Sequence, residues 1–228
     1  MPKNAPVAII TGASRGLGRA LARELAARGW RLVIDARGAD ALENARAELA
    51  ERTTVAALPG DVTDPRHREA LIAAAGDRID LLVNNASRLG PSPQPPLHRY
   101  PLAELERVYA VNVVAPLALA QLALPLMDDG AMILNITSDA AVEVYEGWGG
   151  YGSSKAALEQ LTRVLAVEHP HLRIHAVDPG DMRTQMHQDA FPGEDISDRP
   201  PPEESVPGLL ALIESSRPSG RYQARELG

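Results

Sequence analysis

Six short apolar runs recur along this chain of 228 residues, and helix-like stretches separate successive runs. The runs cover residues 5–10, 31–35, 53–58, 79–84, 131–137 and 172–177. Strands that alternate with helices form right-handed βαβ units, whose strands pair in parallel. After a last helix at 205–216, residues 220–224 suit a short edge strand. The pattern predicts an α/β fold with a doubly wound, mostly parallel sheet of about seven strands and helices on both faces.

A glycine-rich turn follows the first apolar run. Its sequence is TGASRGLG at residues 11–18, and a helix-period stretch at 20–28 comes next. Glycines let a backbone approach a pyrophosphate, and a helix N-terminus offers unpaired N–H groups and the positive end of its dipole. The spacing Gly-x-x-x-Gly-x-Gly differs from the commoner Gly-x-Gly-x-x-Gly, so the turn alone is weak evidence for a dinucleotide site.

Lysine occurs only twice in the chain, at Lys3 and Lys155, because nearly every positive charge is an arginine. Lys155 follows Tyr151 by four residues, which places both side chains on one helix face. A cation beside a phenol stabilises the phenolate and lowers its pKa, so Tyr151 is a candidate general acid or base. A surface pair of neighbours is the alternative interpretation.

Composition narrows the functional class. A hydrophobic content of 45% in 228 residues suits one domain over residues 1–228. The net charge of −7 disfavours nucleic acid and anionic membranes as partners, and we identify no 18-residue apolar span or signal sequence. With no cysteine, and with His169, His171 and His175 expected at the surface, we predict no metal site. We expect a cytoplasmic protein.

Two proline-rich stretches, at 91–101 and 192–202, are predicted loops that follow the carboxyl ends of strands. Open α/β sheets bind ligands at that edge, so we expect a substrate loop at about 181–202, without a long helical lid and with an open, polar mouth. Packing within the loops is an equal alternative for Tyr145 and Trp148. The residues placed near this edge, and so candidates for substrate binding, are Arg88, Val144, Tyr145, Trp148, Met182, Met186, His187 and Phe191.

Taken together, the motifs resemble those of the short-chain dehydrogenase/reductase family, in the family's order and over nearly the full length. The motifs are Thr11-Gly12-x-x-x-Gly16-x-Gly18, Asp61-Val62, Asn84-Asn85-Ala86, Asn112, Ser138, Tyr151-x-x-x-Lys155 and Pro179-Gly180. Ser87 departs from the pattern, since a glycine usually stands there. The resemblance implies a Rossmann-type fold and an oxidoreductase that interconverts a carbonyl and a secondary alcohol by hydride transfer from or to a nicotinamide cofactor.

The resemblance also implies roles for individual residues. Asn112, Ser138, Tyr151 and Lys155 would form a catalytic tetrad, with Tyr151 exchanging the proton, Ser138 polarising the reacting oxygen and Asn112 holding a water beside Lys155. Asp61 would accept from the adenine amino group, whereas Asp64 before Pro65 is the better helix cap. The residues implied in cofactor binding are Gly12, Ser14, Arg15, Gly16, Leu17, Gly18, Arg37, Asp61, Val62, Asn84, Ala86, Tyr151, Lys155, Pro179, Gly180, Met182 and Thr184.

Cofactor choice depends on the end of the second strand. Ala36 stands where NAD-using relatives carry a ribose-binding acid, and Arg37 with Arg15 can clamp a 2′-phosphate, which favours NADP. If the strand ended one residue earlier, Asp35 would reach the ribose and NAD would be used.

A catalytically silent NAD(P)-binding sensor or scaffold is the alternative function, because a fold does not fix an activity. The complete tetrad argues against that alternative. As in the family, we expect a homodimer or homotetramer that forms through helices at about 102–127 and 151–168.

Overall fold

The computed structural model describes residues 5–227, so Lys3 lies outside the described part of the chain. Seven strands pair in parallel throughout, in the order β3-β2-β1-β4-β5-β6-β7, which confirms the doubly wound prediction. The strands are β1 (Val7–Ile10), β2 (Arg31–Ala36), β3 (Val55–Pro59), β4 (Leu81–Asn84), β5 (Met132–Ile136), β6 (Arg173–Asp178) and β7 (Gly220–Gln223).

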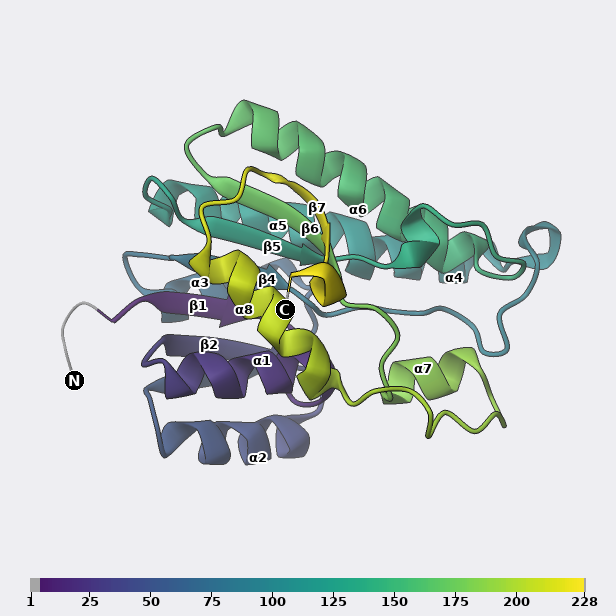
Figure 1. Ribbon diagram of the computed structural model, residues 1–228, viewed down its shortest axis with the longest axis horizontal. Coiled ribbons are helices and arrows are strands. Elements are labelled where there is room, and N and C mark those ends of the chain that lie inside the picture. Colours follow the sequence, from purple (N-terminus) through teal and green to yellow (C-terminus); the bar gives the residue numbers. More distant parts are fainter. Residues whose placement is uncertain (1–4, 228) are drawn as a thin grey trace.

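Helices cover both faces of the sheet (Figure 1). Every residue of β1, β4 and β5 is buried, as expected of parallel strands covered on both faces. One face packs on α1 (Gly16–Ala27), α2 (Ala39–Ala50) and α8 (Val206–Glu214). The other face packs on α3 (Pro65–Ala75), α5 (Ala115–Ala123) and α6 (Gly149–Glu168). Helices therefore cover both faces of the sheet, and ligands can bind only at its edges or at the ends of its strands.

Local signals set the start of α3. Asp64 accepts a hydrogen bond from the backbone N–H of Arg66 at 2.9 Å, and Pro65 occupies the first helical turn. Asp61 instead accepts from the backbone and hydroxyl of Thr63, both at 2.8 Å. The prediction that Asp64 rather than Asp61 caps the helix is confirmed.

One helical segment differs from expectation. Residues Leu102–Leu126 form a continuous helix made of α4 (Leu102–Tyr109), a π-helical turn η2 (Ala110–Val114), α5 and the 3₁₀ turn η3 (Leu124–Leu126). By length and composition this segment could cross a membrane, with a mean hydropathy of 1.6 over a window that is 39% buried in the fold. The statement that the sequence has no such span is wrong. A core helix of a soluble protein passes the same test, because its apolar face covers the sheet.

A second difference concerns His175, which was expected at the surface. It lies in β6 with no exposed area, and its ring packs edge-on against Tyr222 at 5.5 Å between centroids. Burial and the nearby charge of Arg173 lower its pKa to about 4, so the ring is neutral at pH 7. Its position within β6, where every residue after Arg173 is buried, explains the burial.

The loops at the carboxyl ends of the strands carry the remaining secondary structure. Figure 1 shows α7 (Gln185–Ala190) beyond these strand ends, at the side away from the N-terminus. At six residues it is too short for a long lid, and it lies where the sequence predicted only a loop. The strand order reverses between β1 and β4, so their carboxyl ends form the crevice where such sheets bind ligands.

Candidate active site

The glycine turn after β1 is shaped by close contact with the loop after β4. Gly12 has a φ of +68°, and a Cβ there would lie 2.9 Å from the Cα of Ala86. At Gly18 a Cβ would lie 2.5 Å from the side-chain nitrogen of Asn85. Thr11 joins the two loops, because its hydroxyl accepts from the backbone N–H groups of Asn85 and Ala86 at 3.0 Å. Side chains larger than hydrogen therefore cannot enter this turn without moving the backbone.

The backbone N–H groups in the first turn of α1 have no side-chain cap. Arg15 precedes the helix in an extended conformation. Gly16 adds a φ of +57°, and these residues line the cavity described next. The unpaired N–H groups and the positive end of the helix dipole can bind the negative charge of a pyrophosphate. The residues present thus fit a dinucleotide cofactor.

A cavity of about 840 Å³ lies along the carboxyl ends of the strands. Most of the residues predicted from the sequence share it. Those that line it are Gly12, Ser14, Arg15, Gly16, Leu17, Arg37, Asp61, Val62, Ala86, Arg88, Ser138, Trp148, Tyr151, Lys155, Pro179, Gly180, Met182, Thr184, Met186 and His187. Those absent from the lining are Gly18, Asn84, Asn112, Val144, Tyr145 and Phe191.

Tyr151 and Lys155 lie on the first turns of α6 and are buried, with 8% and 2% of their surface exposed. The ammonium of Lys155 is 5.5 Å from the centre of the Tyr151 ring and donates a hydrogen bond to the carbonyl of Ile136 at 2.8 Å. The surface-pair interpretation of this spacing is therefore wrong. Burial lowers the pKa of Lys155 to about 8.

The pKa of Tyr151 moves opposite to the expectation. Burial raises it above the ordinary value of 10, and the carboxylates of Asp178 and Asp139 raise it further. Hydrogen bonds with Ser87 and Ser138 lower it, but by less. The expectation of a lysine-depressed phenol is therefore wrong for this arrangement, because removal of the ring from water outweighs the favourable contacts. Tyr151 is held as a neutral phenol.

Ser138 stands just beyond the end of β5, where its extended backbone turns into the short helix η4 (Asp139–Ala141). Its hydroxyl donates to Asp139 at 2.8 Å and accepts from the backbone N–H of Ala140 at 3.2 Å. The carbonyl of Ser138 also accepts from Arg221 at 3.4 Å. These contacts fix the hydroxyl at the cavity wall, next to Tyr151.

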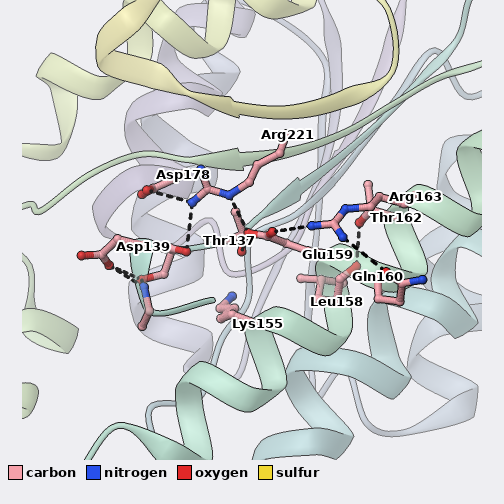
Figure 2. Close-up of polar contacts among 12 residues, drawn as sticks. Thr137, Asp139, Lys155, Leu158, Glu159, Gln160, Thr162, Arg163, Asp178 and Arg221 are labelled. Atoms are coloured by element: carbon pink, nitrogen blue, oxygen red, sulfur yellow. Dashed lines mark hydrogen bonds and ion pairs between the residues drawn. The ribbon is translucent and has the colours of Figure 1, made fainter. Parts of the chain in front are cut away.

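A buried polar network braces this wall from behind (Figure 2). Arg221 on β7 reaches Glu159 at 2.9 Å and Asp178 at 3.4 Å. Glu159, which is 2% exposed, also accepts from the hydroxyl of Thr137 at 2.8 Å. The edge strand thereby ties α6 to the ends of β5 and β6, which carry the site.

Asn112 does not line the cavity. Its carboxamide oxygen accepts from the backbone of Arg88 at 2.8 Å and from the hydroxyl of Ser87 at 3.2 Å. Its nitrogen donates to the carbonyl of Arg88 and to the hydroxyl of Ser154, both at 2.9 Å. With every polar atom engaged, the side chain holds the loop after β4 against α6. The carboxamide therefore has no group free to hold the water that was expected beside Lys155.

Asn84 also points away from the cavity. Its nitrogen donates to Asn135 at 2.8 Å, and Asn135 in turn donates to Thr162 at 2.8 Å. These hydrogen bonds link Asn84 on β4, through Asn135 on β5, to Thr162 on α6. Only Asn85 and Ala86 of the predicted triplet reach the cavity, because they lie in the loop that follows β4, whereas Asn84 is the last, buried residue of the strand.

At the adenosine end, β2 continues through Ala36, as the predicted register requires. The carboxylate of Asp35 accepts from the backbone N–H of Gly12 at 2.7 Å and contacts His67 at 3.0 Å. It is not free to turn to a ribose. Although burial opposes the change, hydrogen bonds from Thr63 and the charges of Arg37 and His67 lower the pKa of Asp61.

An aromatic cluster flanks Tyr151 on the side away from the glycine turn. The ring of Trp148 meets Tyr151 at 5.9 Å, Phe191 at 5.8 Å and Tyr145 at 6.2 Å between centroids. Trp148, Met186 and Ala190 pack against Tyr151. Val144 is 96% exposed, and neither it nor Tyr145 or Phe191 lines the cavity. The predicted substrate residues that reach it are therefore Arg88, Trp148, Met182, Met186 and His187.

The cavity is also lined by residues that were not proposed as site residues from the sequence, among them Ser87, Asp139, Asp178 and Asp35. Ser87 had drawn attention only as a replacement for glycine, and Asp35 only as an alternative ribose ligand. Asp139 follows Ser138, and Asp178 precedes Pro179, so adjacency to motif residues was the available signal. Their effect on Tyr151 depends on distances that the sequence does not contain.

Comparison with known proteins gives a consistent result. A family model described as short chain dehydrogenase matches residues 6–195. The chain is 34% identical over 192 residues to a 3-oxoacyl-acyl-carrier-protein reductase of rhamnolipid biosynthesis from Pseudomonas aeruginosa, covering 79% of this chain and 74% of that protein. It is 38% identical over 191 residues to 2-(R)-hydroxypropyl-CoM dehydrogenase from Xanthobacter autotrophicus, covering 80% and 76%.

Solved structures agree. A short chain dehydrogenase from Shigella flexneri, complexed with NADP, superimposes with a TM-score of 0.89 at 28% identity, covering 97% of this chain and 98% of that one. The range that the family model matches includes the glycine turn, Ser138, Tyr151 and Lys155. From its sequence, its parallel sheet and these relatives, the chain belongs to the short-chain dehydrogenase/reductase family of oxidoreductases.

Proposed function

We propose that the protein is an NADPH-dependent carbonyl reductase. The observation that carries the proposal is the placement of Tyr151, Ser138 and Lys155 on one cavity whose opposite end is an uncapped helix N-terminus with Arg15 and Arg37. One end suits the polyphosphate of a dinucleotide, and the other suits a carbonyl that gains a proton. A bound NADPH would supply the hydride.

The chain's own residues account for the proton. Because burial raises the pKa of Tyr151, its phenol stays protonated at neutral pH and is suited to donate to a carbonyl oxygen. Ser138 has one O–H, which donates to Asp139 here; turned toward the substrate instead, that O–H can donate a second hydrogen bond to the carbonyl oxygen as negative charge develops. Lys155 provides a cation beside the ring at 5.5 Å. This arrangement suits donation of a proton to a carbonyl oxygen, the step that reduction requires.

Cofactor choice rests on the adenosine end. Ala36 offers no acceptor for a 2′-hydroxyl, and Arg37 lines the cavity next to it. A relative of similar structure carries NADP. Of the cofactor residues implied by the resemblance, those that line the cavity remain our candidates, and Asn84 and Gly18 act through the shape of the loops.

The substrate side favours a carbonyl with an apolar neighbour. Leu89, Met186, Ala190 and Trp148 form an apolar wall around Tyr151, while Arg88 and His187 supply polar groups at the cavity edge. The names of two relatives give a 3-oxoacyl-acyl-carrier-protein and a 2-(R)-hydroxypropyl-CoM as what they act on. We therefore propose small ketones with an apolar arm as the class to screen first.

The test follows NADPH absorbance while a panel of such ketones is offered to the parent protein, Tyr151→Phe and Tyr222→Phe. Tyr222 donates its hydroxyl to the carbonyl of Pro218 at 2.7 Å, outside the cavity lining, and serves as the matched control. Tyr151→Phe should lose at least about two orders of magnitude in rate, since it lacks the proton donor. NADPH titration by fluorescence should show unchanged cofactor binding. Full turnover by Tyr151→Phe, or none by the parent with any ketone, contradicts the proposal.

A further inference from the structure

Asp35 is a buried acid in the wall of the cofactor cavity. It is 1% exposed, and each carboxylate oxygen has its own partner. One accepts from the backbone N–H of Gly12 at 2.7 Å, and the other lies 3.0 Å from Nε2 of His67. Because an ionised carboxylate can only accept hydrogen bonds, His67 is the donor. The acid is thereby held from two sides.

The slot for His67 is specifically shaped. His67 lies in the first turn of α3 and is 9% exposed. Its ring packs against Gly60, where a Cβ would lie 2.3 Å from Nδ1. A residue larger than glycine at position 60 would push the ring away from Asp35. Gly12, Asp35, Gly60 and His67 thus form one assembly, drawn from the turn after β1, the end of β2, the end of β3 and α3.

The position of the carboxylate bears on the cofactor. Asp35, Ala36, Arg37 and Asp61 all line the same end of the cavity. A carboxylate free to face that space would repel a phosphate and accept hydrogen bonds from ribose hydroxyls. Held by Gly12 and His67, it does neither, so a 2′-phosphate can meet the guanidinium of Arg37 without a facing Asp35 carboxylate.

We propose that His67 is a positioning residue for cofactor choice, which holds the Asp35 carboxylate against the glycine turn and so preserves the preference for NADPH over NADH. The inference rests on the proposed function and deepens it. His67 touches neither substrate nor cofactor in this account and acts through Asp35 alone.

The test is the ratio of the NADH and NADPH dissociation constants, measured by fluorescence titration on four variants and the parent. His67→Ala releases the carboxylate and should lower the NADPH preference about tenfold, the size of one charge-assisted contact. His67→Gln keeps a donor and should retain most of the preference. In Asp35→Asn/His67→Ala the released group is neutral, so the preference should return. His171→Ala, an exposed histidine remote from the cavity lining, is the matched control and should match the parent.

The outcomes separate the inference from the proposed function. A parent that binds NADPH no better than NADH refutes the proposed cofactor, and the inference with it. If the parent prefers NADPH and His67→Ala leaves the ratio of the two dissociation constants unchanged, the inference is overturned and the proposed function stands. This holds even if both affinities fall. So does a preference that Asp35→Asn fails to restore. If His67→Ala does not fold, the single variant Asp35→Asn is measured instead. Its preference for NADPH over NADH must equal or exceed that of the parent, and a weaker preference overturns the inference.

Discussion

Replacing Lys155 by methionine should make the protein more stable while removing its activity. The ammonium is 2% exposed, and burial lowers its pKa from the ordinary 10.5 to about 8. At about 1.4 kcal/mol per pH unit, keeping this group charged at pH 7 costs about 3 kcal/mol of folding free energy. Methionine has a similar length and no charge to desolvate.

A smaller loss opposes this gain. Lys155 donates to the carbonyl of Ile136 at 2.8 Å, and losing a hydrogen bond from a charged donor costs about 1.5 kcal/mol. The net expectation for Lys155→Met at pH 7 is a gain of about 1.5 kcal/mol in the free energy of unfolding. For a chain of this size that corresponds to a rise in Tm of roughly 3–6 °C.

The pH dependence has a definite sign. The folded-state pKa lies below the unfolded one, so the charged lysine destabilises the fold fully below about pH 8 and the cost disappears as pH rises toward 10.5. The cost of the charge should therefore fall to about half by pH 9.5, and the advantage of Lys155→Met should shrink with it.

Urea unfolding of the parent and Lys155→Met at pH 7 and 9.5 measures both quantities. Lys155→Arg is the control, since it keeps the charge and should gain no stability; it should also lose activity, because a guanidinium is larger than the ammonium it replaces. A methionine variant less stable than the parent at pH 7, or a difference that does not change with pH, would refute the reasoning.

Three further predictions concern the turn, the cofactor and self-association. Gly12→Ala should weaken NADPH binding by at least tenfold in fluorescence titration, because a Cβ would lie 2.9 Å from Ala86 at a φ of +68°; unchanged affinity would mean that the turn yields freely. Ala36→Asp with Arg37→Ala should reverse the ratio of NADPH and NADH dissociation constants, since a carboxylate repels the phosphate and accepts from the free hydroxyl; a ratio like that of the parent would contradict this. Val167, 81% exposed on α6, should lie in the proposed self-association surface, so Val167→Glu should lower the mass measured by light scattering, and an unchanged oligomer would place the surface elsewhere.

Much of the architecture could be predicted from local patterns. Apolar runs of four to six residues between helical stretches have few folded arrangements, so the parallel sheet followed from the runs themselves. Asp64 and Pro65 mark the start of α3 by chemistry that acts within three residues. The spacing of Tyr151 and Lys155 fixes their shared helix face for the same reason.

The electrostatic state of the site could not be predicted this way. The phenol of Tyr151 is neutral because Asp139, Asp178 and the surrounding core act on it through space. Asn112 was expected to hold a water, yet Ser87, Arg88 and Ser154 take up its carboxamide. These partners lie 24 to 42 residues away in the chain, and no spacing rule reports such contacts.

Hydrophobic period, glycine turns and helix caps are short-range properties, so the residue pattern predicts which elements form and which residues they bring to one edge of the sheet. The orientation of each polar side chain at that edge depends on how distant segments pack. Asp35 shows the difference, since its place at the end of β2 follows from the sequence, whereas its carboxylate turns to Gly12 and His67 because those groups arrive from β1 and α3. Burial and hydrogen bonding between distant segments then set the charge that each group carries.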